Sequence, residues 1–242
     1  MFGTPVLILA LDTTTRGGST AVLHDDRALA VVDGDATRTH GERLPPEIAA
    51  ALDAAGQAAA AMDLIAVARG PGAFTGLRIG LATAQGLALT LGLPVVGVPA
   101  LEALAETAAA HAALPPGTIV GAWMDAARGE VFAALYRVAE PRAGGAVCVE
   151  VAGPTAMTPA DTLAAWEGLV PAGACFTGEG AIRYLQGTGR RVVTGVPALA
   201  PAIGRIGRRL AADGQAGPPH ALQPLYIRRP DVVIERERRQ PS

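Results

Sequence analysis

The segment Arg69-Gly-Pro-Gly-Ala-Phe-Thr-Gly-Leu-Arg-Ile-Gly80 constrains the fold of this chain more than any other stretch. Its two leading glycines permit backbone angles closed to other residues, and the proline between them fixes φ. The turn follows a strand-like run at 64–68 and leads into a helical pattern at 76–91, with Thr75 as the expected N-cap. This order predicts an α/β protein. It leaves two interpretations open, an anion site at the helix start or a tight turn that binds nothing.

Two missing residue types exclude several classes of enzyme. The chain has no lysine, so all 20 basic residues are arginine, and a Walker A loop, a Schiff base and a lysine general base are excluded. Serine occurs only as Ser19 and Ser242, neither within a G-x-S-x-G motif. This argues against a serine hydrolase.

Length and charge indicate a folded protein with a sizeable core. The 242 residues suffice for one large or two small domains, half of them are apolar, and the net charge is −2. A disordered chain or a protein that coats nucleic acid is therefore not expected. Cys148 and Cys175 lie far apart and form no C-x-x-C motif. With no signal-peptide pattern at the N-terminus, we expect a cytoplasmic protein.

One stretch is long enough to cross a membrane. Residues 79–101 carry no charge over 23 positions. However, Gly92-Leu-Pro94 ends any helix there, and Val95-Val-Gly-Val98 is typical of a strand. We therefore predict a buried helix followed by a buried strand, and no membrane association.

The predicted elements repeat one order twice: three antiparallel strands, then helix, strand and helix. The predicted strands are 6–11, 19–24, 28–33, 64–68, 95–98, 118–125, 130–137, 147–151 and 174–177. The predicted helices are 43–55, 76–91, 101–113, 161–167, 181–185 and 201–212. We predict an N-terminal lobe over 1–99, a C-terminal lobe over 100–215 and a tail over 216–242.

This duplicated plan resembles the actin-like fold, an α/β fold with two lobes, each a mixed sheet flanked by helices. Its members hold Mg²⁺ and nucleotide phosphates on two Asp-led turns across a cleft. Asp12-Thr13-Thr14 fits the first turn, unless Asp12 only caps its own turn. The second turn, Asp125-Ala-Ala-Arg-Gly-Glu130, carries side chains where such proteins have glycines. Gly178 and Gly180 offer a weak match to an adenine site, so we expect a degenerate nucleotide cleft.

Five motifs in order make the resemblance specific. Leu11-Asp-Thr, the 69–80 segment, Ala84-Gln-Gly-Leu-Ala88, Asp125-Ala-x-Arg-Gly-Glu-Val131 and Leu225-Tyr-Ile-Arg228 together resemble the bacterial TsaB family. The match runs from residue 6 to about 137 and recurs at 225–228, while 138–220 matches only in outline. The long glycine motif is the most specific of the five.

The resemblance implies a non-catalytic dimerisation subunit without a cofactor. Such proteins pair with a catalytic paralogue, TsaD, joined by the ATPase TsaE. The complex places threonylcarbamoyl on the adenosine beside the anticodon of certain tRNAs. TsaD-type paralogues bind metal through H-x-x-x-H, but here the second position is Leu44, after His40, so no metal site is expected. His24, His111 and His220 have no ligand-like neighbours.

Small residues at every fourth position, Gly76 to Gly92, leave one ridge of the 76–91 helix nearly bare. Gly80 and Gly86 within a helix each cost ~0.5–1 kcal/mol relative to Ala, so close packing should offset this. The ridge packs either on its own sheet or on a partner. Given the resemblance, we predict an exposed interface with TsaD, or with a second copy when TsaD is absent. Its residues are Leu44, Ile48, Leu52, Gly76, Leu77, Gly80, Ala84 and Ala88.

Contact with tRNA is expected to be indirect, because no basic patch precedes the charged tail. Two other functions stay open: an active phosphotransferase or ATPase of the actin-like class, and a metallopeptidase related to the glycoprotease families.

Overall fold

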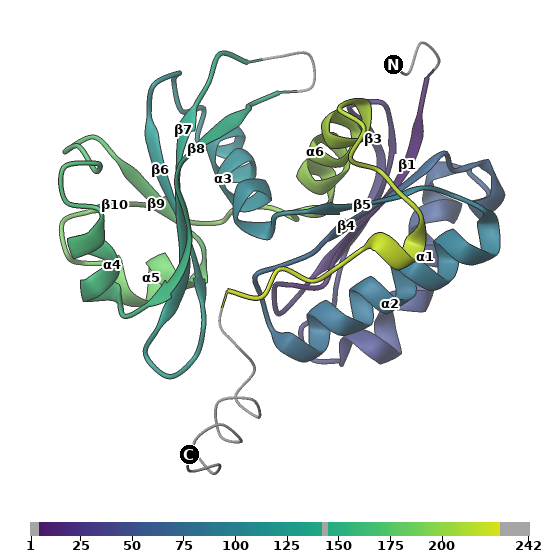
Figure 1. The fold of residues 1–242 in the computed structure, drawn as a ribbon, viewed down its shortest axis with the longest axis horizontal. Helices are drawn as coiled ribbons and strands as arrows, with labels where there is room; N and C mark the ends of the chain where they lie inside the picture. The colour runs from purple at the N-terminus through teal and green to yellow at the C-terminus, as the bar shows by residue number, and fades with distance from the viewer. Residues whose placement is uncertain (1–4, 142–144, 228–242) are drawn as a thin grey trace, which may run out of the picture.

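The computed structural model of the chain describes residues 5–141 and 145–227 and contains two five-stranded mixed sheets (Figure 1). The first has the order β3-β2-β1-β4-β5 and the second β10-β9-β6-β7-β8. The first sheet is built from β1 (Leu7–Asp12), β2 (Ser19–His24), β3 (Arg27–Asp33), β4 (Leu64–Ala68) and β5 (Val95–Val98). The second is built from β6 (Ile119–Asp125), β7 (Val131–Val138), β8 (Cys148–Met157), β9 (Cys175–Thr177) and β10 (Arg191–Val193).

Both sheets have the same topology. In each, the first three strands are antiparallel, and the fourth and fifth run parallel to the first. Two copies of one strand order confirm the predicted duplicated α/β fold of the actin-like type.

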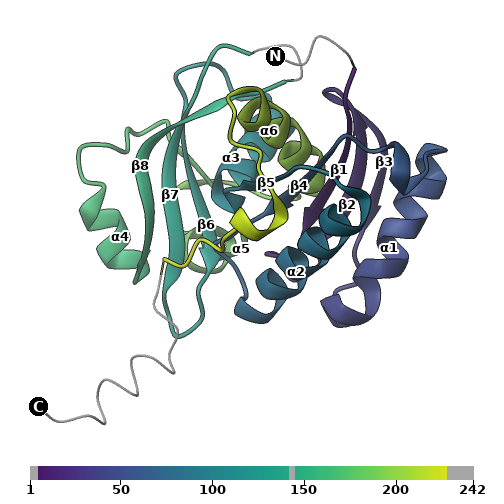
Figure 2. The ribbon, with the colours of Figure 1, turned by 45° about the vertical axis from the view of Figure 1, so that its right-hand side comes forward.

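Helices form three layers around the sheets (Figures 1 and 2). One pair covers the outer face of the first sheet: α1 (His40–Ala55) and α2 (Phe74–Leu91). A second pair lies between the sheets: α3 (Ala100–His111) and α6 (Ala200–Ala212). The outer face of the second sheet carries α4 (Pro159–Ala165) and α5 (Glu179–Leu185). Two short 3₁₀ turns complete the elements, Ala59–Ala61 and Pro219–Ala221.

The two central helices cross over between the halves. Helix α3 packs mainly on the second sheet, whereas α6, which comes from the second half of the sequence, packs on the first. Glycine permits this close approach, because a Cβ on Gly207 would lie 2.6 Å from the Ala66 Cβ on β4. The predicted lobe boundaries stay a prediction, but α6 contacts the sheet of the lobe to which they do not assign it.

The buried side chains form three cores. One lies between the first sheet and α1–α2, and a second between the second sheet and α4–α5. The largest lies between the two sheets and joins residues of both halves, from Ile8 on β1 to Val120 on β6. The lobes therefore share one continuous hydrophobic interior.

Several element ends differ from the prediction. Helix α2 begins at Phe74 with Ala73 as its N-cap, so Thr75 lies inside the first turn and the N-cap prediction was wrong. Helix α1 begins three residues early, where the Thr39 N–H and hydroxyl donate to the Glu42 carboxylate at 3.1 and 2.8 Å. Strand β8 continues to Met157, and β10 was not predicted at all. Both extend along neighbouring strands, which local sequence does not reveal.

After α6, the chain returns along α2 and the edge of the first sheet (Figure 2). The Gln85 side-chain amide donates to the carbonyls of Pro219 and Leu222 at 3.0 and 3.2 Å, and the Leu225 N–H donates to the Arg69 carbonyl at 2.7 Å. Residues 216–227 of the predicted tail thus pack on the fold. The charged run expected to be solvated lies at 228–242, outside the described residues.

The charge-free run at 79–101 is divided between α2 and β5, as predicted. Within the described ranges, no helix combines the length and apolarity needed to cross a membrane.

Candidate functional site

β1 ends at Asp12 and the equivalent strand β6 ends at Asp125, and the charges of both residues act on Glu179 at the start of α5. A pocket of about 360 Å³ opens beside them. Its wall combines the turn after β1, the end of β3, the start of α5 and the segment leading to α6. Both turns thus lie near this pocket, and their assignment to a nucleotide cleft stays a prediction.

The Asp12 carboxylate accepts three hydrogen bonds from its own turn. One oxygen accepts the Thr14 N–H at 2.8 Å and the Thr14 hydroxyl at 2.6 Å, and the other accepts the Thr15 hydroxyl at 2.8 Å. The side chain is buried. Asp12 thus caps its turn, the alternative weighed from the sequence.

Asp125 makes the equivalent contacts in the second lobe. One carboxylate oxygen accepts the Ala127 N–H at 3.0 Å, and the other accepts from the Arg183 guanidinium at 2.7 Å. Ala127 and Arg128 both have left-handed backbone angles, with φ of 58° and 55°. The Cβ atoms that the sequence places on this turn are therefore present where phosphates would need close access to the backbone.

Packing within the chain explains the two glycines that the sequence offered for an adenine site, Gly178 and Gly180. A Cβ on Gly178 would overlap the carbonyl of Trp123, and one on Gly180 would lie 3.1 Å from the Met124 carbonyl. Both glycines let the start of α5 pack tightly on β6. A nucleotide is not needed to explain them.

Negative charge gathers around this cleft. Asp33 and Glu179 line the pocket, near the two capping aspartates. Burial raises the pKa of Glu179, and the charges of Asp125 and Asp12 raise it further. Phosphate groups would meet unfavourable potential there unless cations accompanied them. Whether the cleft binds any nucleotide stays a prediction.

The glycine turn at 69–80 is also filled by the chain itself. A Cβ on Gly70 would lie 2.9 Å from the Leu225 carbonyl oxygen, and one on Gly72 would lie 2.6 Å from the Thr14 Cβ. The motif glycines thus let the turn after β1 and the returning segment near residue 225 pack against this turn. This favours the tight-turn interpretation over an anion site.

The predicted interface residues are buried inside the lobe. All eight are covered by the chain itself: Leu44, Ile48, Leu52, Gly76, Leu77, Gly80, Ala84 and Ala88. On α2, a Cβ at Gly76 or Gly80 would collide with Thr13. The expectation that this ridge is exposed was wrong, because it lets α2 approach the turn after β1. Whether the helix pair contacts a partner stays a prediction.

The outward faces of α1 and α2 are exposed and consist largely of small and apolar residues, with Glu42, Asp53 and Arg78 as exposed charges. We name this surface the outer strip and define it by Pro45, Pro46, Ala49, Ala50, Ala54, Ala82, Gly86 and Leu89. Leu89 is 77% exposed. At Gly86 an added Cβ would have no neighbour within 4 Å. A second row of small residues, Ala82 and Gly86, was the sequence signal that could have revealed this face.

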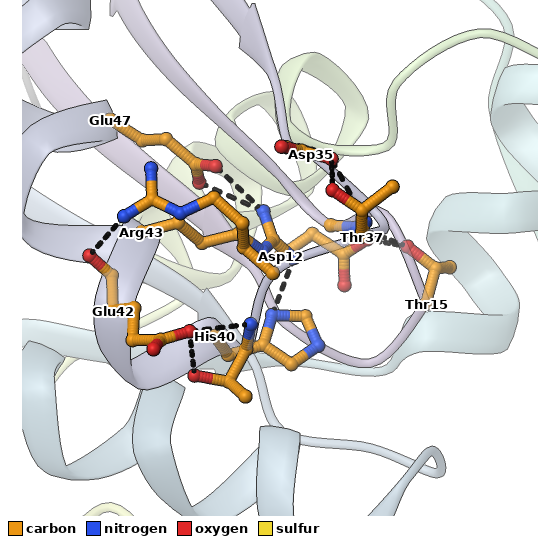
Figure 3. A network of polar contacts seen from close by, with 11 residues as sticks. Asp12, Thr15, Asp35, Thr37, His40, Glu42, Arg43 and Glu47 are labelled. Atoms are coloured by element: carbon orange, nitrogen blue, oxygen red, sulfur yellow. Dashed lines mark hydrogen bonds and ion pairs between the residues drawn. The ribbon is translucent and has the colours of Figure 1, made fainter.

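The Arg43 side chain lies beside His40, one position before the residue that corresponds to the second histidine of TsaD-type paralogues (Figure 3). The Arg43 guanidinium is buried, donates to His40 Nδ1 at 2.6 Å, and pairs with Glu47 at 2.8 and 3.0 Å. Since arginine only donates, His40 Nδ1 is the acceptor and carries no proton. Burial lowers the pKa of His40, and the adjacent Arg43 lowers it further.

This arrangement is unfavourable for a metal ion beside His40, because Arg43 already holds Nδ1 and adds positive charge. Across residues 5–141 and 145–227, no three His, Cys, Asp or Glu side chains are grouped closely enough to hold a metal.

Comparison with known proteins identifies the family. The family described as "TsaD: tRNA N6-adenosine threonylcarbamoyltransferase" matches residues 24–175. An uncharacterized protein of Mycobacterium tuberculosis is 31% identical over 232 residues, 93% of each chain. The Escherichia coli "tRNA threonylcarbamoyladenosine biosynthesis protein TsaB" is 38% identical over 130 residues, 54% of each chain.

A solved structure carries the same fold over nearly its whole length. "YeaZ from Pseudomonas aeruginosa" superimposes with a TM-score of 0.75 at 30% identity, over 91% of this chain and 99% of that one. The duplicated sheets, the filled glycine turn and these similarities agree, and the chain belongs to the TsaB (YeaZ-like) family.

Proposed function

We propose that this chain is a non-catalytic subunit in the biosynthesis of tRNA threonylcarbamoyladenosine. In this role it pairs with a TsaD-type catalytic paralogue, is joined by a TsaE-type ATPase and contacts tRNA only indirectly. The names of its TsaB relatives support the pathway. A homodimer in the absence of TsaD and a cytoplasmic location belong to the same proposal.

The contacts of Asp12 and Asp125 are the observation that best supports a non-catalytic role. Both aspartates that would hold a metal or orient a phosphate are occupied by their own turns, and Asp125 is also paired with Arg183. In the proposed role these carboxylates hold their turns in place and act on no substrate. This arrangement supports the proposal that the two-lobed fold serves association and not chemistry.

The outer strip is the surface best suited to the paralogue. Monomeric proteins rarely expose large apolar areas, and the cores of interfaces are depleted of charge. Small residues such as Ala82 and Gly86 let a partner helix approach the α2 backbone closely. The eight buried residues predicted from the sequence support this surface from beneath.

Co-purification with the TsaD-type protein of the same organism tests the pairing. Leu89→Arg and Ala82→Arg should each abolish association in gel filtration, because a charge would be buried in an apolar contact. Leu169→Arg serves as the control, since Leu169 is an exposed leucine in the other lobe. Unchanged circular dichroism would show that the variants fold. Association as strong as wild type in both strip variants would refute the proposed surface.

The two alternative functions are tested on the isolated chain. Calorimetry with Mg-ATP should show no binding of the kind an active phosphotransferase requires. Elemental analysis should find no stoichiometric zinc or iron. ATP turnover by the isolated chain, or a stoichiometric metal, would replace the scaffold proposal by the corresponding enzyme.

A further inference from the structure

A second pocket, of about 190 Å³, lies at the edge of the first sheet, away from both the cleft and the outer strip. It lies between β5, the start of α3 and the segment that returns after α6. Its polar wall contains Arg69, Glu102, Gln215 and Gln223. This volume lies below the ~300–1,000 Å³ of pockets for drug-sized ligands, so only a small molecule fits.

Arg69 supplies a cation without a protein partner. Its Nε is buried and makes no hydrogen bond, and its guanidinium forms no ion pair with any described residue. Gly97 makes room for this side chain, since a Cβ there would lie 2.8 Å from the Arg69 Cδ. A half-buried guanidinium with unused donors is suited to a carboxylate, which it can bind through two parallel hydrogen bonds.

Glu102 supplies an incompletely balanced carboxylate in the same pocket. The nearest cation is the Arg209 Nη2 at 3.7 Å, but this group lies closer to Glu106, at 2.6 Å. Burial raises the pKa of Glu102 to about 7, and the charge of Glu106 contributes to the increase. The carboxylate would thus gain from an added positive charge beside it.

The other titratable groups around Glu102 come from the second sheet. Glu150 on β8 raises the pKa of Glu102 further. Tyr136 on β7 and Cys148 on β8 face the same cluster and have raised pKa values, mainly through burial. None of these three groups supplies a positive charge near neutral pH, so Arg209 is the main cation acting on Glu102.

The sheet edge adds a donor and an acceptor. β5 is the last strand of its sheet, and both backbone groups of Val95 bond to Gly217 at 2.9 and 3.0 Å. Gly97, two residues further on, presents its N–H and C=O to the same side. On this outer side of β5, neither the N–H nor the C=O of Gly97 has a hydrogen-bond partner among the described residues. Gly97 lies in the pocket wall.

We propose that this pocket binds a small zwitterion of the α-amino acid class, with its carboxylate on Arg69 and its ammonium on Glu102. The two side chains line one pocket yet form no ion pair, so their charged atoms are more than 4.0 Å apart, which leaves room for a ligand between them. This site is independent of the proposed subunit role. Failure of one proposal leaves the other standing.

A thermal-shift screen of the full chain against each of the twenty standard amino acids is the first test. At least one small amino acid should raise the melting temperature. Calorimetry then compares that ligand with its deaminated and decarboxylated analogues. Each analogue lacks one charge and should bind on the order of tenfold more weakly, or worse.

Two variants locate the site. Arg69→Met and Glu102→Gln should each weaken the amino acid by a similar factor, with unchanged circular dichroism. Glu167→Gln makes the same chemical change at an exposed glutamate of the other lobe and should bind like wild type. In ¹H–¹⁵N spectra, the ligand should shift the Gly97 amide signal. Affinity should also fall below neutral pH, because protonation removes the Glu102 charge.

Three results would overturn the proposal. One is that no amino acid binds at millimolar concentration. The second is that the deaminated analogue binds as well as the amino acid, which would make the pocket a simple anion site. The third is wild-type affinity in both Arg69→Met and Glu102→Gln.

Discussion

Gly80 lies on the buried side of α2 and Gly86 on its exposed side, and the two glycines serve different purposes. At Gly80 an added Cβ would collide with the Thr13 side chain, whose hydroxyl is buried without a hydrogen-bond partner. At Gly86 nothing lies within 4 Å. The same residue type is thus required at one position for internal packing and leaves the helix backbone bare at the other.

Two matched substitutions test this difference. Gly80→Ala should destabilise the chain by roughly 1–3 kcal/mol, because Thr13 has no space to move into. Gly86→Ala should stabilise the isolated chain by ~0.5–1 kcal/mol through helix propensity. Urea unfolding monitored by circular dichroism measures both. Equal effects of the two changes would contradict the assigned packing.

This contrast also limits what a bulky change at Gly80 can show. Gly80→Leu, which the sequence alone suggests as an interface test, would disrupt the lobe itself. Loss of association in that variant would therefore say nothing about a partner. Leu89 and Ala82 are cleaner positions, because their side chains are exposed.

At the scale of elements, α3 and α6 are joined by charges where the two halves meet. Arg209 on α6 bonds to Glu106 on α3, whose other oxygen Oε2 is buried without a partner. Glu106 also accepts the Cys148 N–H at 3.1 Å. Glu102, one turn earlier on α3, lies farther from the same guanidinium, at 3.7 Å from Arg209 Nη2. Burial raises the pKa of Glu102 most, the charge of Glu106 raises it further, and Arg209 lowers it only in part.

The raised pKa of Glu102 predicts a pH-dependent stability. Between pH 4.5 and about 7 the folded chain holds a proton that the unfolded chain has released. The contribution of Glu102 to stability is thus present below pH 4.5 and is lost as the pH rises through 7. The stability of Glu102→Gln relative to wild type should therefore increase, by roughly 1–3 kcal/mol, as the pH is raised from 5 to 8.

Denaturant melts at these two pH values measure this change, with Glu167→Gln as the exposed control. A stability difference between Glu102→Gln and wild type that does not vary with pH would show that Glu102 titrates normally.

At the scale of the whole molecule, the core between the sheets couples the lobes. Residues of both sheets and of α3 and α6 belong to one buried cluster. Helix α6 belongs to the second half of the sequence but packs on β1, β2 and β4. We therefore expect the described fold to unfold as one cooperative unit.

Gly207→Ala tests this coupling. The added methyl would meet the Ala66 Cβ on the first sheet and should destabilise the fold by roughly 1–3 kcal/mol. Both tryptophans, Trp123 and Trp166, lie in the second lobe, so their fluorescence reports on the distant half. Its transition should shift together with that of far-UV circular dichroism.

Gly173→Ala, at a loop glycine with nothing within 4 Å, provides the control for Gly207→Ala. A fluorescence transition that stays in place while the circular dichroism splits into two steps would show independent lobes.

The sequence by itself determined most of the elements, their duplicated order and the family, and it missed β10. Strand and helix periodicity, the glycine turn and the order of the five motifs are local patterns. Such patterns can be recognised in the sequence without knowledge of the fold. They also placed Asp12 and Asp125 at the ends of equivalent strands.

Only the tertiary structure decided which side of α2 faces inward, where α6 packs, and which charges remain without partners. Small residues occur on two sides of α2, and helical periodicity cannot tell which side meets the protein's own backbone. Arg69 and Glu102 are 33 residues apart in sequence. The pocket that they share is completed by a third segment, near residue 217. Such contacts between distant segments form only when the chain folds, since no local pattern encodes them.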